Sequence, residues 1–143
     1  MSQIIVAVQE KAVIKASEFL EIEIPEIVLF TSDDADKRNI NSIFFPENYS
    51  VAFNRKWLAY ANPEEILISS FHECRHAFQW LVVSDKYQGN RQVSQSIVKQ
   101  WKANFDNYVQ TTGNIANDTG YLDQQTEKDA ITFSNELLLF FIK

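Results

Sequence analysis

The segment that most constrains the fold is a long amphipathic stretch that begins at Asn62 and reads NPEEILISSFHECRHAFQWLVV. The Asn62 side chain can accept a hydrogen bond from a free backbone N–H at a helix start, and Pro63 suits the first helical position, where no N–H is needed. Glu65 completes an arrangement that resembles a capping box. Apolar side chains then recur at helical spacing. We therefore predict one helix from Pro63 to about Val83.

Both histidines of the chain lie in this predicted helix. His72 and His76 are four residues apart, so they share one helix face and can bind one metal ion. Glu73 lies about 100° further round the helix, where it is poorly placed as a ligand but can activate a metal-bound water as a general base. This is the H-E-x-x-H pattern of metalloproteases. Cys74 lies about 200° from His72, and we expect it to be a small core residue.

The other segments indicate a mixture of helices and strands, with two further helices after the H-E-x-x-H segment. Two short β-type runs on either side of the sequence PEN are expected to form a hairpin, and the acidic stretch SDDAD is expected to be a turn. The main predicted elements are a helix at 3–20, a strand at 21–30, the hairpin at 42–54, a helix near 93–108 and a last helix from about Asp123. The 143 residues are therefore expected to form one α+β domain, 1–143.

Composition narrows the class of protein. Nineteen acidic residues against thirteen basic ones give a net charge of −6, so nucleic acid is not an expected partner. No apolar run approaches the roughly 20 residues that a membrane span needs, and the amphipathic start of the chain is unlike a signal peptide. The single cysteine fits a reducing compartment. We therefore expect a cytoplasmic protein that does not bind a membrane; nothing indicates its oligomeric state.

A catalytic zinc site uses three protein ligands and one open position, and the chain has no third histidine. The third ligand should then be a carboxylate from another helix, for which TEKDAITFSNELL, residues 126–138, is the best segment. His72-Glu73-x-x-His76, followed by a later helix with Glu-x-x-Ala, resembles the gluzincins, zincin metallopeptidases whose third ligand is a glutamate. In size and layout the chain is most similar to the small ImmA/IrrE-like domains.

The resemblance implies a zincin-like α+β fold, with an N-terminal helix, a small, mostly antiparallel sheet, the H-E-x-x-H helix and two further helices. It implies Glu127 as the third ligand of one Zn²⁺ per chain. Asp129 is the alternative, and since the two lie about 200° apart on a helix they cannot serve equally. Two positions depart from the family pattern. Ile131 follows the alanine, where Asn or Asp is usual, and Arg75 stands where a glycine precedes the second histidine.

The function that we expect from these features is zinc-dependent hydrolysis of peptide bonds in a peptide or protein substrate, with Glu73 as the general base. An extended substrate would add to the edge of the strand SVAFN, 50–54. Two alternatives stay open. The fold could bind zinc and act as a regulatory or interaction module without proteolysis, or the chain could be a helical scaffold without metal.

Three residues outside the expected ligand set are also of interest. Arg75 could orient a substrate carboxylate, but we expect it to form a salt bridge. Gln79 either lines the cleft or is solvated. Tyr121, in the loop before the last helix, is a candidate to stabilise an oxyanion.

Overall fold

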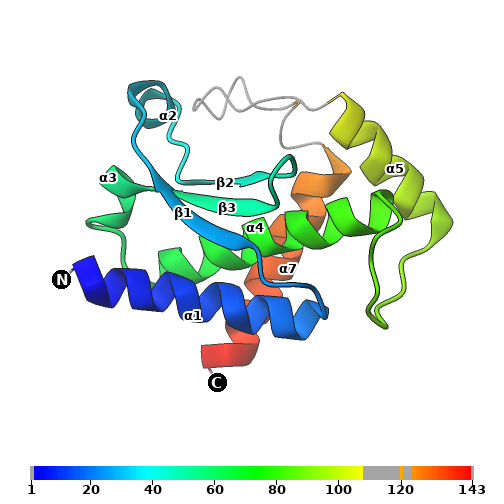
Figure 1. Ribbon diagram of the computed structural model, residues 1–143, viewed down its shortest axis with the longest axis horizontal. Coiled ribbons are helices and arrows are strands. Elements are labelled where there is room, and N and C mark those ends of the chain that lie inside the picture. Colours follow the sequence, from blue (N-terminus) through cyan, green and yellow to red (C-terminus); the bar gives the residue numbers. More distant parts are fainter. Residues whose placement is uncertain (1, 108–119, 121–123, 143) are drawn as a thin grey trace.

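The computed structural model describes residues 2–107, 120 and 124–142 (Figure 1). Its helices and strands follow the order that the sequence indicates, and the α+β class is confirmed. The elements are α1 (Ser2–Leu20), β1 (Glu26–Phe30), α2 (Asp33–Lys37), β2 (Ser42–Phe45), β3 (Ser50–Asn54), α3 (Arg55–Leu58), α4 (Pro63–Val83), α5 (Gln95–Asp106) and α7 (Gln125–Ile142). Among the described residues, no helix combines the length and apolarity that a membrane span requires.

The three strands form a mixed sheet in the order β1-β3-β2. The predicted hairpin is confirmed, because β2 and β3 pair antiparallel with Phe45 opposite Ser50. The expectation of a mostly antiparallel sheet is wrong, since β1 pairs parallel to β3 with Glu26 opposite Ser50. The connection between β1 and β3 contains α2 and β2, and it is long enough to bring the chain back in the same direction.

The strand SVAFN is the central strand β3, so the expectation that it forms an edge is wrong. All five of its residues are buried, whereas β1 and β2 are only partly buried. The edge strand that contacts α4 is β2. The acidic stretch is likewise more than a turn. It forms the short helix α2, whose first turn is capped by the Ser32 hydroxyl oxygen, 3.1 Å from the Ala35 amide nitrogen.

Helix α4 begins and ends where the sequence predicts. Asn62 Oδ1 accepts a hydrogen bond from the Glu65 amide at 2.8 Å, and Asn62 Nδ2 donates to Glu65 Oε1 at 2.7 Å. This pair satisfies a backbone donor that the helix itself leaves free. Helix α4 runs through the middle of the molecule, where it contacts α1, α7, α5 and β2 (Figure 1).

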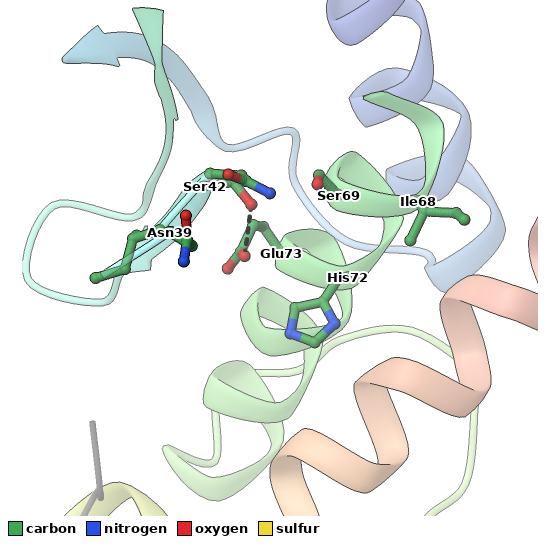
Figure 2. Close-up of a pocket in the computed structure, with 8 residues that line it drawn as sticks. Asn39, Ser42, Ile68, Ser69, His72 and Glu73 are labelled. Carbon is green, nitrogen blue, oxygen red and sulfur yellow. Dashed lines mark hydrogen bonds between the residues drawn. The ribbon is translucent and has the colours of Figure 1, made fainter. Parts of the chain in front are cut away.

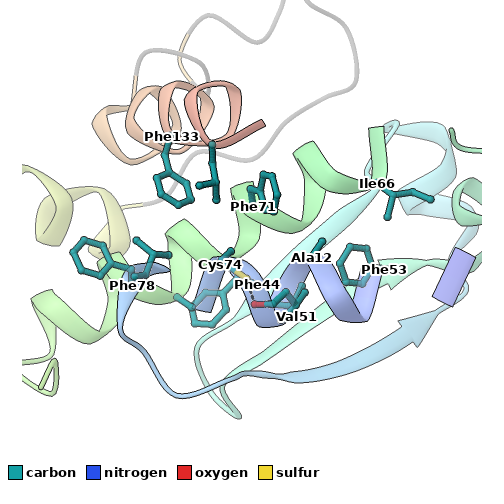
Figure 3. Packing of buried hydrophobic residues seen from close by; sticks show 14 of the residues in the cluster. Ala12, Phe44, Val51, Phe53, Ile66, Phe71, Cys74, Phe78 and Phe133 are labelled. Carbon is teal, nitrogen blue, oxygen red and sulfur yellow. Dashed lines mark hydrogen bonds between the residues drawn. The ribbon is translucent and has the colours of Figure 1, made fainter. Parts of the chain in front are cut away.

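The hydrophobic core lies around α4. Its side chains come mainly from α1, the sheet, α4 and α7, with Leu58 of α3 and Trp101 of α5, and they include the fully buried rings of Phe53, Phe71 and Phe78 (Figure 3). Burial of a side chain of this size contributes about 1.5–3 kcal/mol relative to leaving it exposed. Because α4 is packed on several sides, its rotation about its own axis is fixed, and each side chain that it carries has a defined neighbour.

Removal of the α4 cap should cost stability without touching the core, since Asn62 and Glu65 are exposed. We expect Asn62→Ala to lower the free energy of unfolding by about 1 kcal/mol, measured by urea denaturation. Asn62→Ser is the matched control, because it keeps an accepting oxygen at the cap without placing a second carboxylate beside Glu65, and it should unfold close to the wild type. Equal loss in both variants would contradict the capping role.

Candidate metal centre

Three potential ligands meet where α4 packs against α7. His72 and His76 occupy successive turns of α4, and their Nε2 atoms lie 3.1 Å apart. Glu127, in the first turn of α7, places Oε1 3.1 Å from His72 Nε2 and Oε2 3.1 Å from His76 Nε2. One ligand atom from each of the three residues lies within 4.8 Å of the other two. The three side chains therefore form a group that could hold a metal ion.

This group is largely shielded from solvent. The Glu127 side chain has no exposed surface, and the side chains of His76 and His72 are 10% and 17% exposed. An isolated carboxylate in such a place would be costly, so a buried carboxylate needs a cation or a hydrogen-bond donor beside it. Two imidazole nitrogens and one carboxylate are a ligand set that suits zinc.

Proton binding at His76 and Glu127 is strongly coupled. Burial alone would lower the pKa of His76, but the neighbouring Glu127 carboxylate outweighs burial and raises this pKa to about 9. Burial would raise the pKa of Glu127, but the charge on His76 and hydrogen bonds from both imidazoles bring it well below its usual range. In the metal-free protein, an imidazolium–carboxylate pair therefore holds the group together. A metal ion that binds His76 must displace one of the two protons of this imidazolium.

Glu73 faces a different side of α4 from Glu127. The residue is 6% exposed, and its Oε2 accepts a hydrogen bond from the Ser42 hydroxyl of β2 at 2.8 Å (Figure 2). Glu73 and His72 together border a cavity of about 280 Å³ between α4 and the segment that leads into β2. The cavity is lined by Asn39, Ile40, Asn41, Ser42, Ile68, Ser69, His72 and Glu73. Glu73 thus lies beside the three-residue group without belonging to it.

Asp129, the alternative third ligand, is engaged elsewhere. Asp129 Oδ2 accepts from Arg75 Nε at 2.7 Å, and Oδ1 accepts from Arg75 Nη2 at 3.1 Å. Glu127 and Asp129 point to different partners because residues two apart lie about 200° apart on a helix. The expected salt bridge of Arg75 is confirmed. Its guanidinium also lies over the rings of Phe78 and Phe133, at 4.7 and 4.9 Å from their centroids.

Gln79 is placed differently from either expectation. It has no exposed surface, so it is not solvated, and it is not among the residues that line the cavity. Its Oε1 lies 2.8 Å from His76 Nδ1. The sequence did contain a signal for this contact, since residues three apart on a helix are neighbours. No local signal could have found Ser42, which is far from Glu73 in the sequence and reaches it through tertiary packing.

Cys74 is a core residue, as predicted. Its side chain is fully buried, with Sγ 3.7 Å from the Val13 carbonyl oxygen on α1, and burial raises the pKa of the thiol to about 12. Such a thiol remains protonated at neutral pH and is a poor metal ligand. Tyr121 lies outside the described residues.

Comparison of the chain with protein-family models, with curated proteins and with solved structures found no match in any of the three. The interpretation of this site therefore rests on the residues and their geometry.

The shifted pKa values predict how the stability of the metal-free protein varies with pH. The folded pKa of His76, about 9, exceeds its ordinary value of 6.5, so the ion pair stabilises fully below pH 6.5 and is lost as pH rises through 9. The lowered pKa of Glu127 makes its contribution present above the ordinary value of 4.5 and lost only at lower pH. We expect the free energy of unfolding in a chelator to fall between about pH 6.5 and 9, measured by urea denaturation.

Glu127→Gln is the control for this pH dependence, because it removes the charge that stabilises the protonated imidazole. Its stability should change much less over the same pH range. Excess zinc should reverse the trend in the wild type, since deprotonated histidines bind the metal more tightly. A wild-type stability that rises with pH in the chelator would contradict the ion pair.

Proposed function

We propose that the protein is a zinc-dependent peptidase of the zincin type. In this proposal His72, His76 and Glu127 bind one Zn²⁺, and Glu73 is the general base. The observation that carries the proposal is the meeting of three ligand atoms between two packed helices, with a further buried carboxylate beside them at a cavity. Three protein ligands would leave one coordination position open, as catalytic zinc sites require.

The metal and the chain would have separate parts in the reaction. Bound zinc would polarise a carbonyl oxygen and lower the pKa of a water molecule to about 7. The Ser42 hydroxyl holds one oxygen of Glu73, which fixes the orientation of the carboxylate. Glu73 can then take a proton from water as the scissile carbonyl is attacked and deliver it to the leaving amine.

The position of β2 supports a peptide as the substrate class. β2 is an edge strand, so one side of its backbone is not paired within the sheet, and it contacts α4 next to the cavity. An extended peptide could add to this edge through main-chain hydrogen bonds and bring a carbonyl group toward Glu73. In this proposal the substrate adds to β2, and not to the strand at 50–54 as the sequence pattern suggested.

A regulatory or interaction module that binds zinc without proteolysis is the second candidate. One observation favours it. Ile131, at the position where the family that the chain resembles usually carries Asn or Asp, is 39% exposed and adds no polar group to α7. In that case the three-residue group would be a structural site.

Zinc analysis tests the ligand set directly. We expect about one zinc per purified, untagged chain, and its loss in both His76→Ala and Glu127→Gln, because each removes one of three ligands. Glu136→Gln makes the same chemical change at an exposed position of α7 and should keep the metal. Zinc retained by Glu127→Gln would remove Glu127 from the ligand set. No zinc in the wild type, even after zinc is supplied, would end the proposal.

Substitution of the proposed base separates catalysis from metal binding. We expect Glu73→Gln to keep its zinc and to lose cleavage of a peptide library by at least about 100-fold, because a positioned base contributes about 10²–10⁴-fold. Cleavage products would be quantified by mass spectrometry. Unchanged cleavage in this variant would refute the mechanism. A wild type that holds zinc but cleaves nothing in the library would favour the regulatory module.

A further inference from the structure

The Gln79 side chain connects the proposed metal ligand His76 to polar groups of α7. Its side-chain oxygen lies 2.8 Å from His76 Nδ1. Its Nε2 donates to the Thr126 backbone carbonyl at 3.0 Å and to Asp129 Oδ2 at 2.8 Å. Gln79 has no exposed surface, so water does not replace any of these contacts. The amide therefore bridges α4 and α7 directly behind the ring of His76.

The surroundings of Gln79 allow only one orientation of its amide. A side-chain amide has two donor hydrogens on nitrogen and an acceptor oxygen. The Thr126 carbonyl and Asp129 carboxylate are acceptors, so the NH₂ group must face them. The reverse orientation would turn the amide oxygen toward two other oxygens, which would leave buried polar groups unsatisfied. The oxygen of Gln79 must then face His76 Nδ1, and Nδ1 must carry a proton and donate it.

This constraint decides which nitrogen of His76 is available. A neutral imidazole has one N–H donor and one lone pair, and a proton on Nδ1 leaves the lone pair on Nε2. His76 Nε2 is the atom that lies 3.1 Å from both His72 Nε2 and Glu127 Oε2. We infer that Gln79 is a positioning residue that fixes the tautomer and ring orientation of His76, so that Nε2 binds the metal. The inference deepens the proposed function and rests on it for the presence of zinc.

Asp129 and Arg75 hold Gln79 in this orientation. The Arg75 guanidinium makes two hydrogen bonds to the Asp129 carboxylate, and bidentate pairs of this kind have a defined geometry. The rings of Phe78 and Phe133 lie against the guanidinium and restrict it further. The network therefore runs from two aromatic rings through Arg75, Asp129 and Gln79 to His76. It gives Arg75 a role at the position where the family pattern has glycine.

Nitrogen NMR of the histidine side chains tests the inference in the wild type. In the zinc-loaded protein we expect His76 to carry its proton on Nδ1 and to coordinate through Nε2. In the metal-free protein we expect an Nδ1–H that exchanges slowly with water. The chain has two histidines, so one spectrum of His72→Asn assigns the signals. Coordination through Nδ1, or a rapidly exchanging Nδ1–H, would overturn the inference without any variant of Gln79.

Zinc affinity of Gln79 variants gives the second readout, measured by competition with a chelating dye. We expect Gln79→Met to bind zinc about 10- to 100-fold more weakly, because loss of a partner behind a ligating histidine has effects of this size. Gln79→Glu should not regain the affinity, because its second oxygen would face the Thr126 carbonyl and the Asp129 carboxylate, which are both acceptors. Gln9→Met is the matched control. Gln9, on α1, is also fully buried, and the same substitution there should leave zinc affinity unchanged.

The outcomes separate this inference from the proposed function. Equal zinc affinity of Gln79→Met and the wild type would overturn the positioning role and leave the zinc site intact. Affinity lost equally in Gln79→Met and Gln9→Met would also overturn it, because the effect would then follow from core packing. A wild type without zinc would overturn the proposed function, and the Nδ1–H of the metal-free protein would still decide whether Gln79 orients His76.

Discussion

The buried carboxylate of Glu127 is the constraint on which the rest of the site depends. It lies between two helices with no exposed side-chain surface, and an unpaired charge in such a place costs several kcal/mol. Both imidazoles of α4 meet it at 3.1 Å. A slip of α7 by one turn along α4 would leave the carboxylate without these partners. The same interaction therefore fixes the register of two core helices and brings together the three side chains that could hold a metal ion.

The sequence predicted those features whose causes are local. Asn62 and Pro63 mark the start of α4 because caps act within one turn, and the spacing of His72 and His76 defines one helix face by itself. The prediction that Glu127 is the third ligand rested on a family resemblance, because no local pattern links Glu127 to the two histidines of α4. Its meeting with the histidines depends on how α7 packs against α4. The contact of Gln79 with His76 follows from their spacing on one helix, but the orientation of the Gln79 amide depends on Asp129 in α7.

The sheet shows the same limit at the level of topology. Short β-type runs predicted the strands, and the short connection between β2 and β3 predicted their antiparallel pairing. The direction of β1 could not be inferred, because it depends on the path of the connection that contains α2. That path makes β3 the central strand and leaves β2 at the edge beside α4. The sequence pattern identified both strands, but it did not show that β2, and not β3, is the edge strand next to the cavity.

The two sides of α4 differ in their chemistry. The imidazoles face α7, whereas the chain's only thiol, on Cys74, faces α1 and is fully buried. Oxidation requires an accessible thiolate, and this thiol is neither ionised nor accessible. A metal held by nitrogen and oxygen ligands alone would therefore be independent of the redox state of its surroundings. In sites built on thiolates, by contrast, oxidants remove the ligands themselves. The placement of one small side chain would thus separate metal binding at this helix from redox chemistry.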